Sequence, residues 1–133
     1  MLLSASPVEA ETISLKCAST EWVNESGYDK NVEVVDPSGM EPFFMVIDLK
    51  AKTASVVIQS IRRKYNLEVK NPMLIVSRGS EARATQSNPF IRFTVQSYTL
   101  AFDSFYLALG GSTGIFTMKT KGQCVRGVIP AGN

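Results

Sequence analysis

Residues 42–76 read PFFMVIDLKAKTASVVIQSIRRKYNLEVKNPMLIV, and the patterns in this stretch decide the expected fold. At its start, apolar residues alternate with residues that become polar, which is typical of a half-buried strand. The apolar face of that strand would consist of Phe43, Met45, Ile47 and Leu49. Residues 73–76 at its end form a short, continuous apolar run, which indicates a more central strand.

The segment between these two strands has the spacing of an amphipathic helix. Thr53 is a suitable N-cap, because its hydroxyl can accept a hydrogen bond from an unpaired backbone amide. An apolar stripe then recurs at helical intervals, at Ala54, Val57, Ile58, Ile61 and Tyr65. Val56 is the one apolar residue that falls on the polar side. We therefore expect one helix over about residues 53–65.

Alternating runs outside this unit predict further strands, at residues 13–17, 32–35, 91–95, 100–109, 115–119 and 123–129. Residues 21–23 would continue the first strand after a kink. The sequence DPSG at residues 36–39 is a strong turn, expected to join the strands at 32–35 and 43–50 as a hairpin. Residues 120–122 would form the last turn.

The expected fold class is therefore α+β, with seven or eight mostly antiparallel strands packed on one helix. Short connections favour antiparallel pairing, because parallel strands need long crossovers. A β-sandwich with one helix is the alternative. We expect residues 1–133 to form a single domain, with residues 1–11 as a flexible N-terminus.

Composition excludes several classes of function. With 44% apolar and 20% charged residues, the chain is globular, and its net charge of +2 gives little support for nucleic-acid binding. No apolar run approaches the ~18 residues of a membrane span. The chain contains no histidine, which excludes histidine-dependent catalysis and histidine metal ligation. We expect no cofactor and no metal site.

A non-enzymatic role is favoured, because no catalytic motif is present. The glycine-rich sequence GGSTG at residues 110–114 precedes an expected strand rather than a helix, so it is interpreted as a hairpin turn instead of a phosphate-binding loop. A carboxylate-dependent hydrolase is an alternative. Its candidate residues are Glu33, Asp36, Asp48 and Asp103.

Cys17 and Cys124 lie near opposite ends of the chain, each inside an expected strand. A disulfide between them would close a long loop, whereas two buried thiols would act as small apolar side chains. Both alternatives are open at this point. A mature form with the disulfide would indicate secretion, and a native Met1 would indicate the cytoplasm.

Residues 31–95 resemble the ubiquitin-like β-grasp pattern of Ras-association domains. The resemblance rests on Thr53 at the start of the expected helix and on the sequence KYNL at residues 64–67 at its end. In that family, basic residues on the second strand and the helix face an acidic GTPase. The resemblance implies this role for Lys50, Lys52, Arg62 and Lys64.

These basic residues lead to the functional hypothesis of an interaction module that binds an acidic protein partner. The expected binding surface is a strand-helix corner made of Lys50, Lys52, Arg62, Arg63 and Lys64. The simpler interpretation is that cations at a helix C-terminus complement its dipole. A pathogen or virus protein, either a secreted effector or a self-assembling coat protein, is the alternative function.

Overall fold

A computed structural model of the chain describes residues 12–27, 31–110 and 114–127. The proposed flexible terminus at residues 1–11 lies outside the described residues. The strands are β1 (Thr12–Ser26), β2 (Asn31–Val35), β3 (Phe43–Asp48), β4 (Thr53–Ile58), β5 (Ile61–Lys70), β6 (Met73–Arg78), β7 (Phe90–Gln96), β8 (Ala101–Gly110) and β9 (Gly114–Arg126). Two single-turn 3-10 helices, η2 (Pro37–Gly39) and η3 (Glu81–Arg83), lie in connections.

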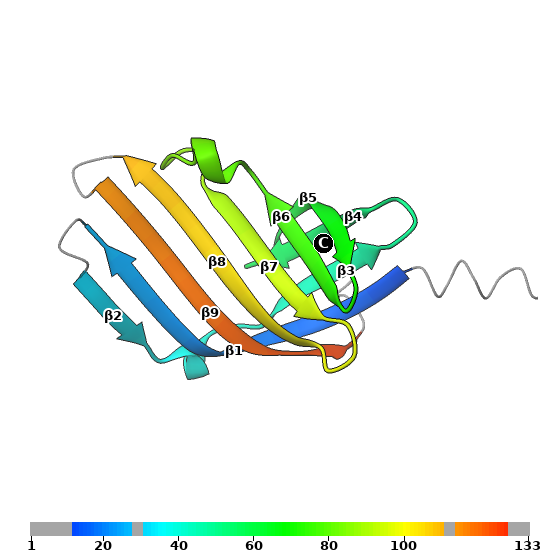
Figure 1. The fold of residues 1–133 in the computed structure, drawn as a ribbon. Helices are drawn as coiled ribbons and strands as arrows, with labels where there is room; N and C mark the ends of the chain where they lie inside the picture. The colour runs from blue at the N-terminus through cyan, green and yellow to red at the C-terminus, as the bar shows by residue number, and fades with distance from the viewer. Residues whose placement is uncertain (1–11, 28–30, 111–113, 128–133) are drawn as a thin grey trace, which may run out of the picture.

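The strands form a closed antiparallel barrel (Figure 1). From β3 to β9 each strand pairs with the next, and β9 returns to pair with β1, which also pairs with β3. The prediction of antiparallel pairing is thus confirmed. The α+β fold class, the β-sandwich alternative and the resemblance to β-grasp domains are wrong, because the described residues contain no α-helix and one sheet closes on itself.

The expected helix at 53–65 is a β-hairpin, formed by β4 and β5 around Gln59 and Ser60. Both turn residues have positive φ angles, 51° and 68°, as a two-residue hairpin turn of the primed type requires. Val56, the misfit of the helical stripe, is only 1% exposed, whereas Ile61 is 55% exposed. The β-branched residues of this segment favour strands. The neighbouring strands bury every second residue, although the same residues also fit a helical spacing.

β1 bends at a β-bulge between Ser19 and Glu21, where its register with β9 shifts. The extra residue reverses the alternation of side chains, so that Cys17 and Trp22 both face the barrel interior although their numbers differ in parity. The kink expected before residues 21–23 is therefore confirmed. The bulge lets one long strand pair with β3 at its start and with β2 at its end, while β9 pairs along its other edge.

β2 and β3 do not form the expected hairpin with each other. Both pair with β1, β2 along residues 22–26 and β3 along residues 12–17. They therefore occupy successive parts of one edge of β1, and the connection at residues 36–42 passes between them. Among the described strands β2 has no second neighbour, so the barrel wall is incomplete beside β2.

The last expected turn, at residues 120–122, is also wrong, because β9 runs through it without interruption. Gly122 is needed there for close packing rather than for a turn. A Cβ atom at this position would collide with the Ala18 carbonyl oxygen and with the Phe102 ring. The glycine thus lets β9 approach β1 next to the bulge.

One half of the barrel interior is filled with side chains. Inward-facing residues from every barrel strand form one apolar cluster, which includes Leu15, Ile47, Leu67, Val76 and Val95. Phe43 packs against this cluster. The centroid of its ring lies 5.1 Å from that of Phe93 and 5.3 Å from that of Phe102. The inward faces of β3 and β7 are those predicted from alternation. The other half of the interior is open and holds the candidate site.

Candidate ligand-binding cavity

A large cavity of about 720 Å³ occupies the open half of the barrel. Its wall is mainly apolar and aromatic, and includes Trp22, Phe43, Ile91, Phe93, Tyr106 and Met118. The connection at residues 36–42, which fills the gap between β2 and β3, contributes Met40 and Pro42 to the rim. The cavity therefore lies where the wall of the barrel is incomplete.

Small polar residues face this cavity from β1, β8 and β9. Ser104 on β8 and Thr120 on β9 are cross-strand partners, and their hydroxyl groups form a hydrogen bond with each other. Ser19 lies near them on β1. Small side chains leave the space that larger ones fill in the other half of the barrel. Because the two hydroxyls satisfy one another, the surface that they present is less costly to cover with an apolar molecule.

A second cavity of about 530 Å³ adjoins the first, and we call it the arginine cavity. Ile58, Gln59 and Ile91 line both cavities. Arg63 and Arg78 line the arginine cavity together with Tyr65, and the connection between β6 and β7 contributes residues 87–89 to its rim. Arg63 and Tyr65 share the inward face of β5 because they are two residues apart on one strand.

Tyr65 separates the arginine cavity from the filled half of the barrel. It is 3% exposed, and its ring centroid lies 6.1 Å from that of Phe93. Burial raises the pKa of its hydroxyl, and the positive charges of Arg78 and Arg63 oppose this shift. The phenol is therefore neutral at pH 7 and can donate a hydrogen bond. Within the described residues its hydroxyl has no hydrogen-bond partner.

Negative charge lies in the connection between β2 and β3, where Asp36 and Glu41 line the large cavity. The Asp36 carboxylate accepts a hydrogen bond of 3.0 Å from the Ser38 backbone amide, which caps η2. This bond lowers the pKa of Asp36, so its carboxyl group is ionised near neutral pH. The large cavity thus has two acidic residues in its lining, and the arginine cavity has two basic ones.

The basic strand-helix corner predicted from the sequence does not form, since the helix is absent. Lys50 and Lys52 lie in the β3–β4 turn at the filled end, where the Lys52 carbonyl oxygen accepts a hydrogen bond from the Leu67 amide. Arg62 is five residues from Leu67 on β5, a separation of about 17 Å at strand spacing. It therefore lies far from Lys52. Arg62 and Lys64 face outward, whereas Arg63 lines the arginine cavity.

The four candidate carboxylates do not converge either. Glu33 lies on β2, Asp36 on the cavity rim and Asp103 on the outer face of β8. Asp48 ends β3 at the filled end, where it accepts hydrogen bonds from the amides of Lys50 and Ala51 at 3.1 Å and 2.9 Å. These placements give Asp48 a structural role in the turn.

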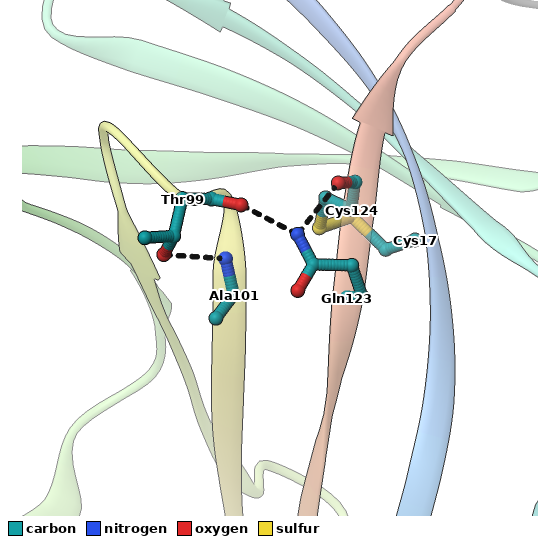
Figure 2. The surroundings of a disulfide bond; sticks show 5 residues. All are labelled: Cys17, Thr99, Ala101, Gln123 and Cys124. Atoms are coloured by element: carbon teal, nitrogen blue, oxygen red, sulfur yellow. Dashed lines mark hydrogen bonds between the residues drawn. A yellow bond between two sulfur atoms is a disulfide. The ribbon is translucent and has the colours of Figure 1, made fainter.

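Cys17 and Cys124 form a disulfide in the structure, with their Cα atoms 4.0 Å apart (Figure 2). They are direct partners on β1 and β9, the two strands whose pairing closes the barrel. Beside them, the Gln123 side chain donates a hydrogen bond to the Thr99 carbonyl oxygen, which ties β9 to the turn before β8 (Figure 2). The alternative of two free thiols is not the one observed.

Trp22, Tyr65 and Arg78 were not identified as site residues from the sequence. The helical pattern places Tyr65 in the expected helix, and Trp22 follows the bulge, where the alternation changes. A sequence signal did exist for Arg78, because it ends the alternation of Leu74 and Val76 on β6. This pattern indicates a site only when β5 is known to be the neighbouring strand, because β5 carries Arg63 and Tyr65.

Comparison with protein-family models and with characterised proteins finds no match to this chain. In the part of the chain that the structure describes, no helix is long and apolar enough to cross a membrane. The same residues include no group of three or more side chains suited to hold a metal ion. The cavity itself is therefore the feature of the molecule that indicates a function.

Proposed function

We propose that this protein binds one small, mainly apolar molecule inside its barrel. The observation that carries the proposal is the large cavity of about 720 Å³ with its aromatic and aliphatic wall. Ligand sites typically have volumes of ~300–1,000 Å³ and apolar walls with a few polar groups. The interior of an eight-stranded barrel is wide enough to hold one small ligand when side chains do not fill it.

The chain provides its own reporter of occupancy. Trp22 is the single tryptophan of the sequence and lines the large cavity. Its indole Nε1 donates a hydrogen bond of 2.8 Å to the Asn24 side-chain oxygen, which fixes the ring on β1. A molecule that enters the cavity would replace water beside the indole and change its fluorescence.

The test is titration with 1-decanol, a neutral apolar probe, followed by tryptophan fluorescence and calorimetry. We expect saturable binding with one site per chain. Ile58→Asn should weaken binding about tenfold, because Ile58 lines both cavities and loses apolar contact with the probe. Val69→Asn is the matched control, since Val69 is 41% exposed, like Ile58 at 40%, and lines neither cavity.

Absence of saturable binding, or equal effects of the two substitutions, would contradict the proposal. Binding of an acidic protein partner through Lys50, Lys52, Arg62, Arg63 and Lys64 stays a separate prediction. The compartment is also part of the proposal. Disulfides persist mainly in oxidising environments, so the Cys17–Cys124 bond supports an extracytoplasmic location.

A further inference from the structure

We propose that the ligand is an amphipathic anion, whose acidic group is bound by Arg63, Arg78 and Tyr65 while its apolar body occupies the large cavity. This inference rests on the proposed function and adds the charge of the ligand and its orientation. The acidic group is a carboxylate or a phosphate monoester, since both fit the planar donor geometry of arginine.

The register of the sheet brings these three residues together. Asn66 on β5 pairs with Ser77 on β6, so the preceding residue Tyr65 lies beside the following residue Arg78. Arg63 is on the same inward face of β5. All three side chains line the arginine cavity. Two cations and one neutral hydroxyl donor thus surround a single space.

These charges have no partner in the described residues. The ion pair found there joins Lys70 and Glu68, and no Asp or Glu lines the arginine cavity. The buried Tyr65 hydroxyl also lacks a hydrogen-bond partner. A buried polar group without a partner is unfavourable, and a bound anion would satisfy both the hydroxyl and the guanidinium groups.

The position of the arginines explains how such a ligand would be oriented. Both arginines are exposed to solvent at the rim, whereas Phe43 and Phe93 lie deeper. Ile58, Gln59 and Ile91 form the shared border of the two cavities. The apolar body of the ligand would pass this border into the large cavity, and its acidic group would stay at the hydrated arginines.

The experiment compares four probes with one common chain, namely decanoate, decyl phosphate, 1-decanol and decylamine, by Trp22 fluorescence at pH 7 and low salt. We expect at least one of the two anions to bind more tightly than the alcohol by about tenfold or more, as charge-assisted hydrogen bonds predict. The anion with the greater advantage identifies the acidic group. The advantage should shrink as salt is added.

Three variants assign the effect to residues. Arg63→Gln, Arg78→Gln and Tyr65→Phe should each reduce the preference for the anion and leave the affinity for decanol within about twofold, since none of them removes the apolar wall of the large cavity. Arg62→Gln and Lys64→Gln are the controls, because these residues neighbour Arg63 in sequence but face outward. Thermal unfolding of each variant checks that it is folded.

The outcomes separate the two proposals. Equal affinity of the wild type for the anions and decanol would overturn this inference and leave the proposed function intact. Tighter binding of decylamine would also overturn it, and would indicate that Asp36 and Glu41 in the large cavity bind the charged group. An equal loss of anion preference in Arg62→Gln and Arg63→Gln would show that general surface charge causes the preference. That result would overturn the assignment to the arginine cavity. Failure of all four probes to bind would contradict the proposed function itself.

Discussion

Val56 occupies the position at which the inner wall of β4 faces the arginine cavity, and it is 1% exposed. Its cross-strand partner is Arg63, whose side chain lines the same cavity. The apolar Val56 thus lies directly opposite the charged Arg63, at the border between the filled and open halves of the barrel. The burial of this single side chain distinguishes a hairpin from a helix over the same residues.

We expect Val56→Ala to lower the free energy of unfolding by about 2 kcal/mol, through lost apolar burial and the space left behind. Ile61→Ala should change it by less than about 0.5 kcal/mol, because Ile61 is 55% exposed. Urea unfolding of both variants measures the difference. The opposite order would support the helix, in which Ile61 lies on the buried stripe and Val56 does not.

At the scale of an element, the β4–β5 hairpin carries much of the candidate site. Its β5 strand supplies Arg63 and Tyr65, and its turn supplies Gln59. The turn contains neither glycine nor asparagine, although both Gln59 and Ser60 have positive φ angles. Left-handed backbone is unfavourable for residues with a Cβ atom, so this turn stores strain beside the cavity.

Ser60→Gly should therefore stabilise the protein by about 0.5–1 kcal/mol, because glycine adopts a positive φ without steric cost. Ser60 lines neither cavity, so ligand affinity should be unchanged. Ser55→Gly is the matched control, and should destabilise the protein because Ser55 lies within β4. A higher urea midpoint for Ser60→Gly alone is the expected result, and a lower one would contradict the turn assignment.

At the scale of the whole molecule, the disulfide joins the first and last strands of the closed sheet. Its two cysteines are 107 residues apart in sequence and direct neighbours in the structure. A cross-link between such distant residues restricts the unfolded chain, as the loop-closure model describes. It also lies in the filled half of the barrel, away from both cavities.

Replacing both cysteines, as Cys17→Ala with Cys124→Ala, should lower the free energy of unfolding by about 4–5 kcal/mol on that model. Ligand affinity of the folded variant should change little. Reductant should lower the urea midpoint of the wild type and leave that of the double variant unchanged. An unchanged midpoint in the reduced wild type would show that the bond does not contribute to stability.

The sequence by itself determined much of the local structure. Alternation at residues 43–49 and 91–95 predicted the inward faces of β3 and β7, and short connections predicted antiparallel pairing. These features depend on neighbours within one strand, where period two follows from backbone geometry. The sequence also supplied both cysteines as candidates for a bond and Arg63 as a candidate binding residue, for a different kind of ligand.

Only the tertiary structure decided the rest. Residues 53–65 satisfy both a helical and an alternating pattern, and the choice depends on the β3 and β6 strands that pair with the hairpin. Closure of the sheet by β1 and β9 creates an interior, and the bulge in β1 decides that Trp22 faces it. Tyr65 and Arg78 meet because their strands are paired in one register. The cavity exists because distant inward faces enclose it, which no single stretch of sequence encodes.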